Sequence, residues 1–345
     1  MKVGVLTAGG DCPGLNAAIS TIGRLAERDG NQAVGFRHGF RGLAEGELVD
    51  LSSLDLPRAA AAGGTVLGAS SFDPFRESAT GQVTETVSNE GIDAVIVIGG
   101  EHSMEVASRL SADLDLPVVG IPKTIDNDVT GTEFTLGFDT AVQIATEAID
   151  RVKTTAESHD RVIVVEVMGR NTGWIALWSA IASAADIAVI PEVETTVPRI
   201  CERVRDIHEG GKDFSIVVVA EGASLAPSPG EGKKVLISTD PDPYGYERLG
   251  GIAVEMARAI ALGTGFETRA TILGHVQRGG APTAADRVLA TRLATSAYDA
   301  ALSQNTGRMA ALEGSEVVLV PLSGVSGVKL CDPEKIAAAE RLGLL

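Results

Sequence analysis

Short apolar runs alternate with longer amphipathic stretches along most of the chain. The first run, residues 3–6, leads into a glycine-rich turn, and the apolar positions between Leu15 and Leu25 then keep a 3.6-residue period that ends near Gly30. That period marks one face of a helix, and a glycine just beyond it is typical of a helix end. The same order of apolar run, turn and helical pattern recurs at the runs 92–98, 117–121, 162–167, 187–190 and 214–220.

Near-continuous Val/Ile runs separated by helices predict parallel sheets covered by helices on both faces. The 345 residues, 44% hydrophobic with a mean hydropathy of +0.17, suffice for a large core and suggest about two domains. We therefore predict an α/β fold with two similar domains, each a mostly parallel sheet flanked by helices. The Pro-, Gly- and Ser-rich stretch 224–245 is predicted to be a surface loop.

Charge and composition narrow the range of partners and compartments. A net charge of −17 argues against nucleic acid and anionic membrane, because both require a basic footprint. No apolar run approaches the roughly 20 residues that span a bilayer, and the start of the chain resembles a strand rather than a signal peptide. Cys12, Cys201 and Cys331 lie far apart with no CxxC pair, which argues against a disulfide framework or a zinc site. We expect a cytoplasmic protein.

Three turns that follow predicted strands carry polar chemistry. TAGGDCPGLN at 7–16 suits close backbone approach to an anion, although it is neither GxGxxG nor a P-loop and also fits a plain tight turn. IGGEHS at 98–103 puts Glu101 where a carboxylate serves either as a magnesium ligand or as a helix N-terminal charge. PKTIDND at 122–128 gathers a cation, a hydroxyl, an amide and two carboxylates at a strand end, which favours a functional loop.

Cations are scarce in this acidic chain, so their placement is informative. Several stand at the ends of predicted strands: Arg161, Arg170, Arg269, His275 and Arg278. Arginine's planar fork matches phosphate geometry, so this set predicts a phosphate clamp.

Taken together, these segments resemble the phosphofructokinases over nearly the whole chain. The motifs that carry the resemblance occur in family order: GGDCPGLNAAI, GGTVLG, IGGE, PKTIDND, GFDTA, VVEVMGR, VVAEGA and RATILGHVQRGG. The resemblance implies phosphoryl transfer from pyrophosphate or ATP to the 1-hydroxyl of fructose 6-phosphate. It also implies a phosphoryl-donor domain of residues 1–137 with about 277–327, and a sugar-phosphate domain of residues 138–276 with about 328–345.

The resemblance also implies roles for single residues. Asp126 would be the catalytic base, with Thr124, Lys123 and Gly10 beside the transferring phosphoryl group. Glu101 and Asp128 would bind Mg²⁺, and the donor would contact Gly10, Gly100, His102, Ser103 and Lys123. The sugar phosphate would contact Met168, Gly169, Arg170 and Glu221, with its 6-phosphate held by Arg161, Arg269, His275 and Arg278. In the family, the counterparts of Arg161 and Arg269 reach in from a neighbouring subunit, which implies a homo-oligomer, a tetramer or a dimer.

Three positions depart from the family pattern. Ser70 and Ser71 stand where an arginine usually follows GGTxLG, His102 stands where glycine or aspartate is common, and Asn171 replaces a frequent histidine. A bulky side chain at position 102 disfavours a nucleotide, so we favour pyrophosphate over ATP. Two alternatives stay open: a kinase for another sugar phosphate, such as a seven-carbon analogue, and a low-activity or regulatory paralogue.

Overall fold

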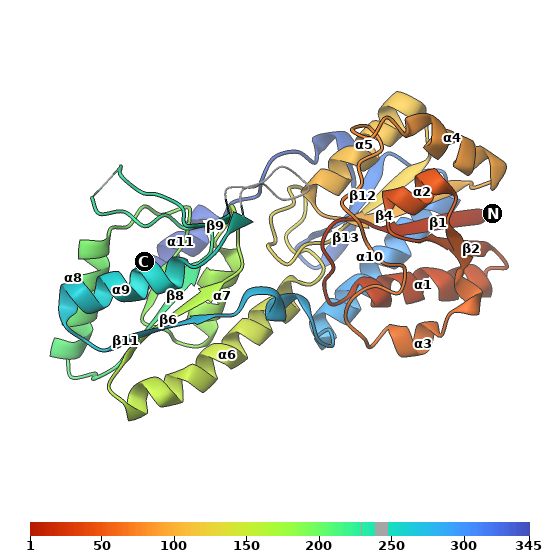
Figure 1. Cartoon of the computed structure of the whole chain (residues 1–345). Helices are drawn as coiled ribbons and strands as arrows, with labels where there is room; N and C mark the ends of the chain where they lie inside the picture. The colour runs from red at the N-terminus through yellow and green to blue at the C-terminus, as the bar shows by residue number, and fades with distance from the viewer. Residues whose placement is uncertain (229, 239–247) are drawn as a thin grey trace. The chain divides into compact units, whose positions relative to one another are not determined.

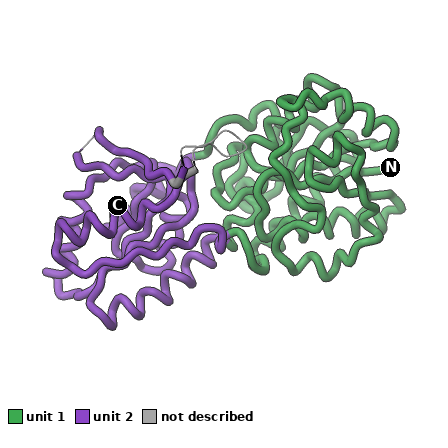
Figure 2. Tube along the Cα trace, viewed as in Figure 1, with its two compact units in different colours: residues 1–140, 278–329 green, residues 141–277, 330–345 purple. Residues whose placement is uncertain are grey.

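The computed structural model describes residues 1–228, 230–238 and 248–345. The chain forms two compact units (Figure 2). Unit 1 contains residues 1–140 and 278–329, and unit 2 contains residues 141–277 and 330–345. Each unit is built on its own sheet (Figure 1), as the sequence predicts.

Within the described residues, unit 1 has a seven-stranded sheet in the order β13-β12-β5-β4-β1-β2-β3. The strands β5, β4, β1 and β2 run parallel, whereas β3 and β13 pair antiparallel at the two edges. Their bounds are β1 Lys2–Thr7, β2 Gln32–Phe36, β3 Leu48–Asp50, β4 Ala94–Gly99, β5 Val118–Pro122, β12 Arg308–Glu313 and β13 Glu316–Pro321. Strand order reverses beside β1, and in such sheets ligands bind beyond the carboxyl ends of the strands at the reversal.

Helices cover both faces of this sheet (Figure 1). Helices α1 and α10 pack together on one face. On the other face, α2, α4 and α5 close a core that includes Leu6, Phe36, Val97 and Met104. The bounds are α1 Leu15–Arg28, α2 Phe40–Glu45, η1 Leu51–Ser53, α3 Leu56–Ala59, α4 Thr80–Asn89, α5 Glu101–Leu114, α10 Ala284–Leu302 and η3 Leu322–Gly324.

Unit 2 has a four-stranded, fully parallel sheet in the order β11-β6-β8-β7 among the residues described. Its bounds are β6 Val162–Val167, β7 Ile187–Val189, β8 Ser215–Ala220 and β11 Thr268–Ile272. Buried Val164, Val217, Ile252 and Met256 belong to the core beneath α8 and α9. The helices are α6 Phe138–Ser158, which begins in unit 1, α7 Trp174–Ala182, α8 Val197–Glu209, α9 Ile252–Thr264, η2 Gly274–Arg278 and α11 Pro333–Arg341.

The predicted loop 224–245 is wrong in one part. Strand β9 (Leu236–Ser238) lies inside it and pairs antiparallel with β10 (Arg248–Leu249). Strand β9 forms because β10, which follows it in sequence, supplies a hydrogen-bonding partner. Residues 229 and 239–245 of that prediction lie outside the described residues.

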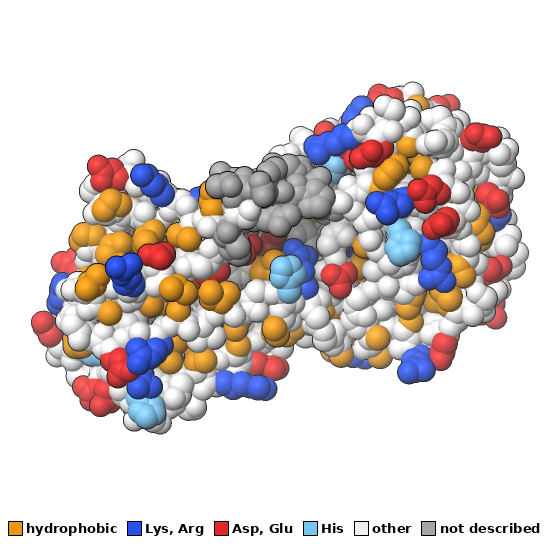
Figure 3. Space-filling view, viewed as in Figure 1, with side chains coloured by type: hydrophobic (Ala, Val, Ile, Leu, Met, Phe, Trp, Pro, Cys, Tyr) orange, Lys and Arg blue, Asp and Glu red, His pale blue; other side chains and the backbone are white. Residues whose placement is uncertain are grey.

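Two properties of the described surface and helices bear on partners. On the face shown in Figure 3, Lys and Arg side chains lie among Asp and Glu side chains. None of the helices that the structure describes combines the length and apolarity that a bilayer crossing requires.

Candidate active site

Three turns lie side by side at the carboxyl edge of the sheet in unit 1. They follow the neighbouring strands β1, β4 and β5, and backbone hydrogen bonds join them: Ala8 donates to Ile98 (2.9 Å) and Lys123 donates to Gly99 (2.8 Å). A Cβ atom placed on Gly100 would lie 3.4 Å from the carbonyl oxygen of Lys123. The structure therefore brings Gly10, Gly100 and the 122–128 loop together, although they are far apart in sequence.

The conformation of the 122–128 loop is fixed by the buried side-chain amide of Asn127. Asn127 has a φ of 52° and is fully buried. Its Nδ2 donates to the carbonyl of Glu133 (3.1 Å), and its Oδ1 accepts from the backbone N–H of Thr135 (3.1 Å). The Thr135 hydroxyl donates to the Thr124 carbonyl (2.6 Å). Asn127 and Thr135 position the flanking Asp126 and Asp128, a role that the sequence hypothesis did not assign. The sequence could have suggested the role of Asn127, because asparagine tolerates the left-handed region of backbone conformation. No sequence pattern indicated the role of Thr135.

Three carboxylates influence one another at this edge. Burial, together with the charges of Asp126 and Glu101, raises the pKa of Asp128 to about 7. The Thr124 hydroxyl opposes that rise by hydrogen bonding to Asp128, and its oxygen also accepts from the backbone N–H of Asp126 (3.2 Å). The predicted base and both predicted metal ligands are thus close enough to repel one another, as carboxylates that share a charged ligand do.

Lys123 is buried against the turn that follows β1. Its side chain is 3% exposed, and its ammonium group donates to the carbonyl of Gly10. Burial lowers the pKa of Lys123 from its usual value. The neighbouring Cys12 donates to the Leu136 carbonyl (3.3 Å), and burial raises the pKa of its thiol to about 12. Cys12 therefore stays a thiol at neutral pH and is not an activated nucleophile.

The imidazole of His102 lies beside an aspartate that the sequence hypothesis missed. Its Nε2 lies 3.1 Å from Oδ2 of Asp73, and its Nδ1 lies 3.6 Å from Oε2 of Glu105. Asp73 is itself fixed, because its Oδ1 accepts from the backbone N–H groups of Phe75 (2.8 Å) and Arg76 (3.3 Å). Residues of this group line a cavity of about 230 Å³: Asp73, Phe75, Arg76, His102, Glu105, Val106 and Arg109. The side chain of Ser103 instead packs against Gly99, where an added Cβ would lie 2.3 Å from that of Ser103.

The residues of the predicted sugar wall lie at the carboxyl ends of β6 and β8 in unit 2. Glu221 donates from its backbone to Val167 (2.9 Å), and Gly222 donates to Gly169 (3.0 Å). A Cβ on Gly222 would collide with the carbonyl oxygen of Arg170 at 1.8 Å, so glycine is required for this close approach. The structure thus joins the segments that contain Met168, Gly169, Arg170 and Glu221.

One amide side chain ties this wall to the next turn. The Oε1 atom of buried Gln277 accepts from the backbone N–H of Met168 (3.3 Å), and its Nε2 donates to the carbonyl of Gly274 (3.1 Å). The intervening His275 is exposed. Gln277 therefore positions the turn that carries His275, and nothing in the sequence pattern indicated this role.

The predicted clamp is not gathered at one place in unit 2. Arg161 and Arg269 lie at the amino ends of the adjacent strands β6 and β11, at the other end of the sheet from Met168 and Arg170. Both pair with Glu267, Arg161 at 2.9 Å and Arg269 at 2.5 Å. The hydrogen bond from Arg161 lowers the pKa of Glu267. Arg278 belongs to unit 1, where its guanidinium lies against Gly10.

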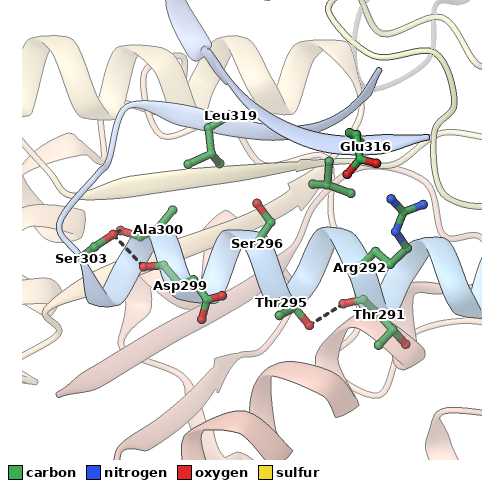
Figure 4. Close-up of a pocket in the computed structure, with 10 residues that line it drawn as sticks. Thr291, Arg292, Thr295, Ser296, Asp299, Ala300, Ser303, Glu316 and Leu319 are labelled. Atoms are coloured by element: carbon green, nitrogen blue, oxygen red, sulfur yellow. Dashed lines mark hydrogen bonds between the residues drawn. The ribbon is translucent and has the colours of Figure 1, made fainter. Parts of the chain in front are cut away.

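A hollow of about 520 Å³ lies elsewhere in unit 1, between α10 and β13 (Figure 4). Its hydroxyls bond to the backbone of α10: Thr295 donates to the Thr291 carbonyl (2.8 Å), and Ser303 donates to the Asp299 carbonyl (2.8 Å). None of the residues lining this hollow belongs to the predicted site.

Known proteins resemble this chain along nearly its whole length. Residues 2–301 match the sequence model of a family described as Phosphofructokinase. The chain is 48% identical to a pyrophosphate–fructose 6-phosphate 1-phosphotransferase of Amycolatopsis mediterranei, with 99% of both chains covered. It is 46% identical to ATP-dependent 6-phosphofructokinase 3 of Streptomyces coelicolor, again with 99% of both covered. A phosphofructokinase structure from Saccharomyces cerevisiae superposes with a TM-score of 0.78 at 29% identity; the match covers 99% of this chain and 47% of that one, so the chain spans about half of the yeast protein.

Proposed function

The chain belongs to the phosphofructokinase family, and from that premise we propose that it transfers a phosphoryl group from pyrophosphate, or from ATP, to the 1-hydroxyl of fructose 6-phosphate. The product is fructose 1,6-bisphosphate. The observation that carries this proposal is the group of mutually repelling carboxylates, Asp126, Asp128 and Glu101, at the same sheet edge as Lys123 and the Gly10 turn. Phosphoryl transfer needs this combination of one proton acceptor and several charge-neutralising groups.

Asp126 acts as the base in this proposal. The 1-hydroxyl oxygen attacks phosphorus as its proton passes to the Asp126 carboxylate, and the bond from phosphorus to the leaving phosphate breaks in line. Thr124 and the buried Asn127 fix the loop so that the carboxylate keeps its position between binding events. Lys123 offsets negative charge on the donor.

Glu101 and Asp128 fit a magnesium site. The structure shows no group of three or more His, Cys, Asp or Glu side chains arranged around a metal within the residues it describes. Mg²⁺ commonly takes only one or two carboxylates and fills its other positions with water and phosphate oxygens, so two carboxylates suffice. Burial and repulsion by neighbouring carboxylates raise the pKa of Asp128, and a divalent cation bound by Glu101 and Asp128 would offset that repulsion. When bound, the ion neutralises charge on the phosphates.

We assign the phosphoryl donor to unit 1 and the sugar phosphate to the wall of unit 2. Arg161 and Arg269 stand at the far end of the unit 2 sheet from that wall, which supports a homo-oligomer, a dimer or tetramer, in which a second copy supplies them. Exposed Ile272 (49%) and Val276 (69%), in and just after β11, support the same conclusion, because apolar side chains near a sheet edge favour coverage by another chain. A cytoplasmic location remains a prediction from the sequence.

Pyrophosphate is the favoured donor. Relatives named for either donor are similar to this chain to nearly the same degree, so identity does not decide between them. The imidazole of His102 follows Gly100 directly and lies beside Asp73, where it takes up room that a glycine would leave for a nucleotide's inner phosphate. Pyrophosphate has no such group to accommodate.

A coupled assay of the purified protein tests the proposal. With fructose 6-phosphate and Mg²⁺, we expect turnover with pyrophosphate and a higher kcat/KM for pyrophosphate than for ATP. Omitting magnesium or adding a chelator should abolish turnover with either donor. Absence of turnover with both donors at saturating sugar phosphate would overturn the proposed function, and a higher kcat/KM with ATP would overturn the donor assignment alone.

A further inference from the structure

The last stretch of unit 1, residues 325–329, pairs with the chain directly after the 122–128 loop. Val328 and Val129 form an antiparallel bridge between the two stretches. Val129 and Val325 are both buried in the apolar core of unit 1. Packing and backbone pairing therefore fix residues 325–329 beside the loop that carries the predicted base and a predicted metal ligand.

Lys329 contacts both ends of the stretch that begins at Asp128 and ends at Glu133. Its backbone N–H donates to the carbonyl of Asp128 (2.9 Å). Its half-buried side chain turns to the other end, where the ammonium donates to the carbonyls of Thr132 (2.9 Å) and Glu133 (2.8 Å). One residue thus closes this stretch, although 196 positions separate it from Glu133 in the sequence.

The carbonyl of Glu133 joins Lys329 to the buried amide of the loop. This carbonyl accepts from Nδ2 of Asn127 (3.1 Å) as well as from the Lys329 ammonium, and its oxygen has a lone pair for each. Asn127 has a φ of 52°, and a residue in that region keeps its conformation only where its surroundings fix it. Lys329 is therefore one of the groups that fix the backbone between Asp126 and Asp128.

We propose that Lys329 is a positioning residue for the metal site, because it holds the loop so that the Asp128 carboxylate and Glu101 can bind Mg²⁺ together. The inference rests on the proposed function and adds a residue to it. Lys329 acts through the backbone of residues 128–133.

The sign of its effect separates position from charge. A positive charge near a cation site weakens cation binding, so loss of the charge alone would tighten the binding of Mg²⁺. Loss of a group that orients a metal ligand weakens metal binding, by about ten- to hundredfold where such groups have been removed. Position and charge therefore predict opposite changes when the Lys329 ammonium is removed.

Lys329→Met tests the proposal by metal binding, without turnover. Mn²⁺ takes oxygen ligands as Mg²⁺ does, and its binding is followed by the water proton relaxation rate with imidodiphosphate at saturation. A parallel titration with β,γ-imido-ATP makes the result independent of the donor. We expect Mn²⁺ affinity to fall by about tenfold, the lower end of the range because Lys329 acts through the backbone. Lys329→Arg keeps a donor to the two carbonyls and should restore most of the affinity.

Steady-state kinetics give a second measurement. In Lys329→Met, the Mg²⁺ concentration for half-maximal rate should rise, whereas kcat at saturating Mg²⁺ should change less and KM for fructose 6-phosphate should stay the same.

Two further variants serve as controls. Lys2→Met is matched, because the Lys2 ammonium also donates to a backbone carbonyl in unit 1, that of Glu90 (2.8 Å), at the amino end of β1; its Mn²⁺ affinity should equal that of the wild type. Thr130→Val removes the hydrogen bond from Thr130 to the carbonyl of Ser326 (3.2 Å) and keeps Lys329, so it should weaken Mn²⁺ binding by less. Thermal unfolding shows which variants are folded.

The outcomes distinguish this inference from the proposed function. Unchanged or tighter Mn²⁺ binding in folded Lys329→Met would overturn the inference, as would an equal loss in Lys2→Met. If Lys329→Met does not fold, Thr130→Val decides, and unchanged Mn²⁺ binding there would overturn the inference. A wild-type protein that binds Mn²⁺ with either analogue but turns over neither donor would overturn the function alone. A wild-type protein that binds no Mn²⁺ with either analogue would overturn the metal site and this inference with it.

Discussion

The sheets of the two units each carry a pair of cations, and the pairs differ in what neutralises them. In unit 1, Lys123 and Arg278 lie at the carboxyl edge against backbone carbonyls. In unit 2, Arg161 and Arg269 lie at the amino edge and share the carboxylate of Glu267. Both pairs retain net positive charge, but only the unit 2 pair forms salt bridges with a carboxylate, that of Glu267.

This difference predicts different kinetic roles. The unit 1 cations lie at the turn after β1, which is next to the turn that carries Asp126 and Asp128, so they are expected to act on turnover. The unit 2 arginines are exposed enough to exchange Glu267 for a phosphate, and such exchange governs how tightly a substrate binds. Substitutions in the two regions should therefore separate kcat effects from KM effects.

The largest expected effect is that of Asp126→Ser. Removal of the base should lower kcat by about 10²–10⁴-fold while fructose 6-phosphate still binds. Steady-state kinetics and equilibrium binding of the sugar phosphate measure the two quantities separately. Asp299→Ser, an acid-to-serine change on α10 outside the site, is the matched control and should leave kcat unchanged. Near-normal turnover in Asp126→Ser would show that another group accepts the proton.

The next effect concerns the unit 2 edge. Arg269→Met should weaken fructose 6-phosphate binding, by about 2–5 kcal/mol where a second copy buries the pair, because a phosphate loses its charged partner. The effect should be a raised KM with a smaller change in kcat. The matched variant Glu267→Gln removes the competing carboxylate and keeps both arginines, so its KM should stay the same or fall. If Arg269→Met lowered kcat and left KM unchanged, the two cation pairs would not differ in kinetic role.

The smallest effect concerns donor choice. His102→Gly should raise kcat/KM for ATP by about tenfold relative to pyrophosphate, because the space beside Gly100 opens. Asp73→Asn keeps the imidazole but removes the negative charge 3.1 Å from its Nε2, so it should shift the donor ratio in the same direction by less. Measuring both donors on the three proteins checks this order. Efficient ATP use by the wild type, unchanged in His102→Gly, would show that the imidazole does not obstruct the nucleotide.

The repeating order of strand, turn and helix could be predicted from local pattern. The predicted run 162–167 coincides with β6, and the other predicted runs differ from β1, β4, β5, β7 and β8 by at most two residues at an end. Buried parallel strands are apolar on both faces, so they stand out from the helices between them. Strands β2, β3, β12 and β13 of the unit 1 sheet were not among the predicted runs. The edge strands β3 and β13 are half exposed, so their pattern is weaker, but β2 is largely buried and exposure does not explain why it was missed.

The sequence by itself determined the fold class, the family and the turns that bear Lys123, Asp126, Asp128 and Glu101. Each of these depends on residues that are adjacent or close together along the chain. Only the tertiary structure decided which of these groups meet. The contact between Arg278 and Asp11 spans 267 positions, and the pairing of His102 with Asp73 joins a loop to a helix. Such contacts depend on strand order and on how loops cross the sheet edge, which local periodicity does not encode. The neutralisation of each cation, and with it the distinction between Arg278 and Arg269, therefore emerges only in the folded chain.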